Sequence, residues 1–147
     1  MPEMPLRHLS PEECLGLLAG QRLGRVALSV GALPAILPVN YAVFEGSIVL
    51  RTAPGTKLSA ALMGAVVGFE IDSTASDHES GWSVLVVGHA SEVRDETKLE
   101  RLRRVSLESW APDHRDHFVE IPIERVSGRA FGQVPGLDSV SEAPRHP

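Results

Sequence analysis

Two cations and two hydroxyls lie within a few residues of one another, on either side of a Pro-Gly turn: Arg51, Thr52, Thr56 and Lys57. Arg51 and Thr52 end an apolar run, and Thr56 and Lys57 open an Ala/Leu-rich segment, 56–64, that predicts a short helix. Free backbone N–H groups and the positive end of a helix dipole favour an anion, so this turn is a candidate phosphate site. The same residues also fit a solvated turn in which Thr56 is an ordinary helix cap. The P-loop pattern G-x-x-x-x-G-K-[ST] is absent.

Two further runs carry groups suited to a flat ligand ring. Pro38 lies within the run Pro38-Val39-Asn40-Tyr41 of a predicted strand, where a proline removes a ladder hydrogen bond and indicates an edge or irregular backbone. Such backbone exposes N–H and C=O groups, although an ordinary edge-strand proline explains the residues equally well. Trp82 and Ser83 begin a strongly apolar strand, and they offer a stacking face and a hydrogen bond. The alternative for Trp82 is that it closes one end of the core.

The elements that must hold these residues are mostly strands. A capping box at Ser10 and Glu13 starts a first helix that Gly20 ends. Six strands are predicted at 24–29, 35–44, 47–52, 65–72, 81–93 and 118–131, with helices at 56–64 and 95–110. Short Gly-containing turns favour antiparallel pairing, and the order of elements does not alternate as in a doubly wound sheet. The sequence therefore predicts a mainly β (α+β) fold, a six-stranded antiparallel closed or split β-barrel with flanking helices.

Domain organisation and composition narrow the function classes. One domain is expected over residues 1–132, followed by a mobile tail at 133–147. A net charge of −5 argues against a nucleic-acid-binding protein. The apolar run 60–69 is far shorter than the ~20 residues that span a bilayer, and the N-terminus lacks a signal-peptide pattern. With a single cysteine, Cys14, a cytoplasmic protein without a membrane partner is expected.

The remaining polar residues suggest no catalytic triad, carboxylate pair or metal cage. His114 and His117, with Asp113 and Asp116 nearby, are explained better by a solvated loop than by metal ligation. His89 is expected to be a structural histidine with satisfied hydrogen bonds. The sequence therefore assigns no catalytic residue and no metal ligand.

In this order along the chain, the motifs resemble the pyridoxamine 5′-phosphate oxidase-like family of FMN-binding split-barrel proteins. Within it, the chain looks most similar to the branch of nitroimidazole-resistance-type flavoproteins. The resemblance covers about residues 8–131 and is carried by the motifs at 38–41, 50–52, 55–57, 69–72 and 81–90. It implies a homodimer with two FMN sites at the subunit interface.

The resemblance also implies which residues contact the cofactor: Pro38, Val39, Asn40, Tyr41, Arg51, Thr52, Thr56, Lys57, Trp82, Ser83, Trp110 and Arg129. The first four would line the flavin ring with backbone groups, and the next four would hold its phosphate. The following pair would make a polar contact to the flavin, and the last two would approach it from the partner subunit. The chain lacks the C-terminal arginine and histidine pair of true pyridoxamine phosphate oxidases, so vitamin B6 oxidation is not expected.

The implied function is FMN-dependent hydride or electron transfer to or from a small organic substrate, with the chemistry supplied by the flavin. Arg129 near the reduced, anionic ring would favour reduction electrostatically. One alternative is a deazaflavin (F420)-dependent reductase on the same fold, which would need more basic residues along a groove. Another is a non-enzymatic flavin- or haem-binding protein, with His89 or His117 as a haem ligand. A dimer without a cofactor is the third.

Overall fold

The computed structural model describes residues 5–53, 55–105, 117–134 and 136–137. Within these ranges the elements are β1 (Leu6–His8), α1 (Pro11–Ala19), β2 (Leu23–Val30), β3 (Leu33–Phe44), β4 (Ser47–Arg51), α2 (Lys57–Leu62), β5 (Val66–Thr74), β6 (Gly81–His89), β7 (Ser91–Glu92), α3 (Glu96–Arg103), β8 (Phe118–Pro122) and β9 (Arg125–Phe131). The mainly β class is confirmed. The described residues contain nine strands, however, and not the predicted six.

Two predicted strands are each interrupted. The strand predicted at 81–93 is interrupted at Ala90, whose N–H still donates to the Ala65 carbonyl at 2.8 Å, and beyond it β7 pairs with β8 instead of β5. The strand predicted at 118–131 turns between β8 and β9, where the Glu124 N–H donates to the Pro122 carbonyl at 2.9 Å. The third difference is β1, a three-residue strand that pairs with β9 near the other end of the chain.

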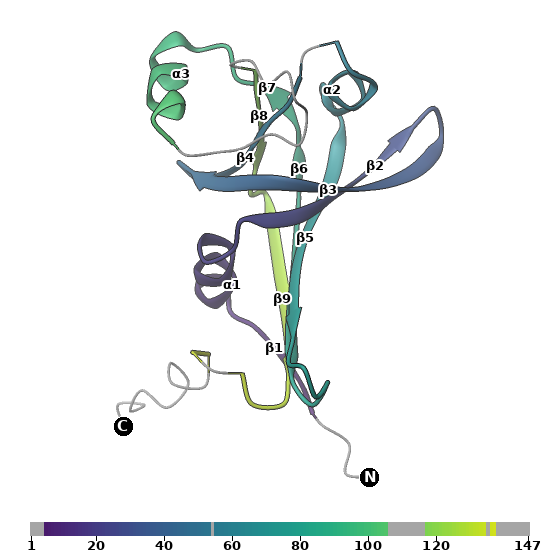
Figure 1. Cartoon of the computed structure of the whole chain (residues 1–147), viewed down its shortest axis with the longest axis vertical. Helices are drawn as coiled ribbons and strands as arrows, with labels where there is room; N and C mark the ends of the chain where they lie inside the picture. The colour runs from purple at the N-terminus through teal and green to yellow at the C-terminus, as the bar shows by residue number, and fades with distance from the viewer. Residues whose placement is uncertain (1–4, 54, 106–116, 135, 138–147) are drawn as a thin grey trace.

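The strands form one curled antiparallel sheet in the order β1-β9-β6-β5-β2-β3-β4-β8-β7. The long strand β3 pairs with β2 over residues 33–40 and with β4 over 41–44, so it joins the two halves of the sheet. In Figure 1, β2 and β3 cross the upright strands β5, β6 and β9. The half-barrel closes where Gly88 of β6 meets β8, since a Cβ on Gly88 would lie 2.1 Å from the Pro122 carbonyl oxygen.

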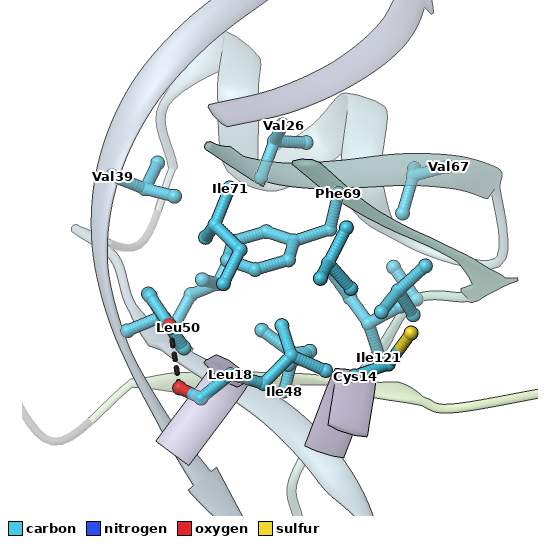
Figure 2. Close-up of a cluster of buried hydrophobic side chains, with 14 of the residues drawn as sticks. Cys14, Leu18, Val26, Val39, Ile48, Leu50, Val67, Phe69, Ile71 and Ile121 are labelled. Carbon is cyan, nitrogen blue, oxygen red and sulfur yellow. Dashed lines mark hydrogen bonds between the residues drawn. The ribbon is translucent and has the colours of Figure 1, made fainter. Parts of the chain in front are cut away.

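The main core fills the concave side of the sheet around Phe69 (Figure 2). The Phe69 ring lies edge-on to Tyr41, with centroids 4.7 Å apart. The Tyr41 hydroxyl donates to the Leu18 carbonyl at 2.6 Å, which ties β3 to α1. Gly24 makes room for the Phe69 ring, because a Cβ there would lie 2.3 Å from its tip.

A second apolar cluster lies on the opposite face of β4, formed by Val49, Val93, Leu99, Leu102 and Phe118. The helix α3 covers it and is held by Lys98 on Glu120 and by a bidentate pair from Arg101 to Glu45, at 2.9 and 3.1 Å. Both faces of the β4–β8 ladder are therefore packed. This fixes the position of the turn that follows β4.

The predicted domain boundary at residue 132 falls inside the packed region. Val134 and Leu137 are 7% and 6% exposed and belong to the main core. Residues 138–147 lie outside the described residues, so the mobile tail stays a prediction. None of the helices in the described ranges has the length and apolar character needed to cross a membrane.

Candidate functional site

The predicted phosphate residues lie where β4 ends and α2 begins. Thr52 follows the last residue of β4, and its backbone N–H donates to the His117 carbonyl at 3.0 Å. Thr56 caps α2: its hydroxyl accepts the Ser59 N–H at 3.0 Å and donates to the Ala53 carbonyl at 3.1 Å. Lys57 is the first helical residue and is exposed. Thr56 therefore has the capping role that the sequence offered as an alternative, in the same turn as Lys57.

The side chains of Arg51 and Thr52 leave β4 on opposite faces, because successive strand residues alternate. The Arg51 guanidinium lies over the Phe118 ring, 5.5 Å from its centroid, on the side covered by α3. Arg51 pairs with Phe118 in register, so Thr52 comes next to His117 and shares its face of the ladder. The predicted set of four is therefore divided between the two faces of this ladder.

Thr52 supplies the test of whether this turn fits a phosphoryl group. It is 5% exposed, and its Oγ1 is a buried side-chain atom that makes no hydrogen bond within the part of the chain that the structure describes. An unsatisfied buried hydroxyl costs about 1–3 kcal/mol, and native proteins keep few of them. In a turn that also carries Lys57, this hydroxyl fits an oxygen atom of a bound phosphoryl group.

The sequence does not assign to the phosphate a row of polar side chains beside Thr52, and it considers one of them, His117, only as a metal or haem ligand. The Ser59 hydroxyl lies 3.0 Å from His117 Nε2, and His117 Nδ1 lies 3.0 Å from a Glu92 carboxylate oxygen. The other oxygen of Glu92 accepts from Arg94 Nε at 3.1 Å. The prediction of a solvated loop is wrong for His117, whose side chain is 14% exposed. The residues come from three separate elements, so no spacing in the sequence relates them.

Other predicted polar residues have simpler surroundings. His89 is exposed and its Nδ1 is held by the Glu124 carboxylate at 3.0 Å, in agreement with a hydrogen-bonded structural histidine. Within the described ranges, no group of three or more His, Cys, Asp or Glu side chains could hold a metal ion. His114, Asp113, Asp116 and Trp110 lie outside the described residues.

The run 38–41 lies on β3 just before β4 joins it. The Tyr41 N–H donates to the Arg22 carbonyl, so odd-numbered residues of β3 bond to β2 and even-numbered ones direct their backbone groups away from it. Pairing with β4 starts only at Tyr41. Pro38 thus occupies an open side of the strand, which confirms the predicted edge position, and the carbonyls of Pro38 and Asn40 face away from β2.

The side chains of this run divide in the same way. Val39 and Tyr41 are 8% and 3% exposed and belong to the main core, so their side chains cannot contact a ligand outside it. Pro38 and Asn40 are on the outer, convex face of the sheet, opposite Arg25 and Leu23. From this run, a flat ligand could contact those two residues and the open backbone groups.

Ser83 and Arg129 lie near the other end of β6, on the wall of a surface pocket of about 350 Å³. Ser83 pairs in register with Asp72 on one side and Arg129 on the other, so all three side chains share the outer face. Trp82 also lines the pocket but is 8% exposed and packs in the main core, as the core-closing alternative expects. The rest of the lining is Leu6, Glu70, Thr74 and Phe131.

The pocket is flanked by two carboxylates that share one guanidinium. Arg25 NH1 donates to Glu70 at 3.2 Å and to Asp72 at 3.0 Å. Burial and the neighbouring Asp72 raise the pKa of Glu70 to about 7, against the opposing effect of Arg25. The pocket therefore carries a carboxyl group that exchanges a proton near neutral pH.

The turn after β4 and this pocket are separated by most of the length of β6. Ala90, just past β6, accepts the Gly64 N–H at 2.8 Å and so marks the end near α2, whereas Ser83 marks the pocket end. Seven residues of strand at about 3.3 Å each separate them by roughly 23 Å. One chain does not bring the two groups of predicted residues into one compact site.

Comparisons with known proteins place the chain among relatives of the same fold. The family model described as pyridoxamine 5′-phosphate oxidase matches residues 10–130. An uncharacterised protein of Mycobacterium tuberculosis is 38% identical over 126 residues, which cover 82% of each chain.

Solved structures of similar proteins share this fold. The FAD binding protein from Mycobacterium smegmatis is 37% identical, with 86% of this chain and 98% of that chain covered and a TM-score of 0.73. An FAD-binding protein from Mesorhizobium loti is 27% identical, with coverage of 89% and 100% and a TM-score of 0.69. A Bacteroides thetaiotaomicron protein of the 5-nitroimidazole resistance type is 13% identical, with coverage of 89% and 90% and a TM-score of 0.65, so that likeness concerns the fold alone.

Proposed function

We propose that this chain, which belongs to the pyridoxamine 5′-phosphate oxidase family, binds a flavin nucleotide and uses it to transfer hydride or electrons to or from a small organic substrate. The observation that carries the proposal is the buried hydroxyl of Thr52, which makes no hydrogen bond to the described residues and lies in the turn with Lys57. The names of the two FAD-binding relatives support the same class of ligand.

A bound flavin would supply the redox-active ring, and the protein would supply binding, orientation and electrostatics. The turn at Thr52 and Lys57 would anchor the phosphoryl end. The open backbone groups of Pro38 and Asn40 offer hydrogen bonds to a ring edge. Arg129 on the outer face offers a positive charge that would stabilise a reduced, anionic ring.

The identity of the nucleotide is a finer part of the proposal. FMN is the expectation from the sequence resemblance, while the name of the relative at 37% identity favours FAD. Both nucleotides carry a phosphoryl group after the ribityl chain, so the Thr52 turn suits either. Deazaflavin F420 remains the alternative on the same fold. A haem on His117 is disfavoured because both of its ring nitrogens already contact other side chains.

We further propose a homodimer in which the outer face of one chain meets the turn after β4 of the other. The separation of the two groups along β6 supports this, because in a dimer the Thr52 turn of one chain could lie against Ser83 and Arg129 of the other. The outer face also exposes large apolar side chains that solvent alone would disfavour: Leu6, Leu23, Ile36, Val66 and Leu85.

The absorbance spectrum of the purified protein tests flavin binding directly. Flavin bands in the blue and near-ultraviolet are expected, and mass spectrometry of the released cofactor separates FMN, FAD and F420. A Soret band would replace the proposal by the haem alternative. A colourless protein that gains no bound absorbance with any of the three cofactors would remove it.

A mixing experiment tests whether the site is shared between subunits. Lys57→Ala and Arg129→Ala each damage a different contribution to the site, so either homodimer should bind flavin weakly. A mixed dimer would contain one site with both residues intact, and dissociation and reassociation of the two variants should restore binding in about a quarter of all sites, as expected from random pairing. No recovery in verified mixed dimers would show that each chain builds its site alone.

A further inference from the structure

The row Ser59, His117 and Glu92 is built from three elements that meet beside Thr52. Ser59 is 6% exposed and its hydroxyl lies 3.0 Å from His117 Nε2. Glu92 lies 3.0 Å from His117 Nδ1 and is itself held by Arg94. A serine on the short helix α2 is thus connected through an imidazole to a carboxylate on β7, a linkage that the packing of these elements does not by itself require.

The charge of Glu92 determines how His117 presents its other nitrogen. A carboxylate has no hydrogen to give, and its charge favours a hydrogen on Nδ1. In the neutral imidazole, Nε2 then accepts the Ser59 hydroxyl hydrogen. In the imidazolium, Nε2–H donates to the Ser59 oxygen, and the hydroxyl hydrogen becomes available to another acceptor. The protonation of His117 therefore decides whether Ser59 can donate a hydrogen bond to a ligand.

Thr52 gives an independent reason to place a ligand here. Its buried Oγ1 makes no hydrogen bond to the described residues, and it lies on the same face of the β4–β8 ladder as His117. The Ser59 hydroxyl thus contacts this imidazole directly, and Thr52 lies opposite His117 on the same face of the ladder. Among the described residues, the charged groups on the elements that meet here are Glu92 and Arg94 beside the ring and Lys57 on α2, while Arg51 lies on the opposite face against Phe118.

We propose that Glu92 and His117 are positioning residues that turn the Ser59 hydroxyl into a hydrogen-bond donor, so that Ser59 and Thr52 together bind a phosphoryl group that takes up one proton at His117 as it binds. The proposal rests on the proposed function, because the phosphoryl group in question is that of the flavin nucleotide. It adds three residues that the sequence-based assignment lacks, and it makes phosphoryl binding proton-coupled.

The experiment uses the full chain and three ligands: inorganic phosphate, FMN and riboflavin. Binding is measured by titration calorimetry in buffers of different ionisation enthalpy, which gives the number of protons taken up. In mildly alkaline buffer, the wild-type protein should take up about one proton per phosphate bound. Ser59→Ala should bind phosphate and FMN about tenfold more weakly, as for loss of one hydrogen bond to a charged group, with riboflavin affinity unchanged. A general loss of structure would weaken all three ligands alike.

His117→Gln separates positioning from folding. Its amide N–H can donate to Ser59 permanently, so phosphate affinity should stay within about threefold of wild type while proton uptake disappears. Glu92→Gln should lower both affinity and proton uptake. His89→Gln, an exposed histidine–glutamate pair of the same kind, is the matched control and should change neither.

The possible outcomes separate this inference from the proposed function. Phosphate binding with proton uptake in a protein that binds no flavin would keep the inference for phosphoryl ligands and remove the flavin. Flavin binding that is equally tight in Ser59→Ala, or that takes up no proton, would overturn the inference and leave the function standing. A wild-type protein that binds none of the three ligands would overturn both.

Discussion

The two ends of β6 carry polar residues in contrasting settings. Near α2, the side chains of Ser59, His117 and Thr52 are largely buried; Ser59 and His117 contact each other, and the Thr52 backbone N–H donates to the His117 carbonyl. At the pocket end, Arg25, Glu70 and Asp72 are each between about a third and a half exposed. Buried polar contacts in a low dielectric hold a fixed geometry, whereas exposed ion pairs are screened and contribute little.

This difference suggests that the two ends of β6 bind different kinds of group. A rigid, nearly satisfied set of hydroxyls suits a group that stays in place, such as the phosphoryl end of a cofactor. An open pocket with a carboxyl that titrates near neutral pH suits a group that comes and goes, such as a substrate or a partner's surface. The predictions below perturb both ends at once, then each end by itself.

The largest effect is expected at Gly88, where β6 closes against β8. A Cβ there would lie 2.1 Å from a backbone oxygen that cannot move without opening the half-barrel. Gly88→Ala should lower the free energy of unfolding by about 3 kcal/mol and disturb both ends of β6. Gly68→Ala on β5 is the matched control, because its Cβ would meet only ordinary contacts at 3.7 Å. Urea unfolding of both variants measures the difference, and equal stabilities would contradict the proposed closure.

The second prediction removes charge at the α2 end alone. Arg51→Ala with Lys57→Ala should weaken flavin nucleotide binding about tenfold, because the charged contact from Lys57 to the phosphoryl group is lost, while Arg51 lies on the opposite face of the ladder. Unfolding stability should fall by only about 1 kcal/mol, mainly through the lost contact between Arg51 and Phe118. Fluorescence titration gives the affinity. Arg125→Ala, an exposed cation on β9, should bind as wild type; a similar loss there would indicate a general charge effect.

The sequence predicts best those features that depend on neighbouring residues. The capping box at Ser10, the cap at Thr56 and the hairpins come from local patterns, and the structure has them. Apolar residues alternate at Val119, Ile121 and Ile123, one residue past the end of β8, so the pattern conceals where that strand ends. The strand β1 has no local signal because its partner, β9, lies far along the chain.

At the candidate site too, the contiguous residues are the ones that the sequence identifies. The turn from Arg51 to Lys57 is contiguous, so its residue types alone indicate an anion site. Strand alternation already places Arg51 and Thr52 on different faces once β4 is assigned. The contacts of Ser59, His117 and Glu92 join residues from α2, β7 and the start of β8, and only the folded sheet brings them together.

The third prediction concerns the pocket end and its pH dependence. The pKa of Glu70 is about 7 in the folded chain against an ordinary value of 4.5, so the folded state binds more protons than the unfolded state between these values. Stability should therefore fall as the pH rises from 4.5 to about 7, by about 1 kcal/mol after allowance for solvent screening. In Glu70→Gln this part of the decline should disappear. A pH profile of unfolding that is identical in the two proteins would contradict the assignment.

The fourth prediction has the smallest expected effect, and it tests the contrast between the two ends of β6 most directly. Thr52→Val keeps the shape of the side chain and removes the buried Oγ1 that makes no hydrogen bond to the described residues. If that hydroxyl serves a ligand, the ligand-free protein should become more stable by up to about 1 kcal/mol, while phosphate and flavin nucleotides bind more weakly. Ser83→Ala at the solvent-open pocket is the comparison and should leave the stability of the ligand-free protein within a few tenths of a kcal/mol. A residue that weakens the fold on its own and strengthens the complex is expected where binding geometry has been favoured over stability. A Thr52→Val variant that is less stable without ligand would instead make this hydroxyl part of the fold.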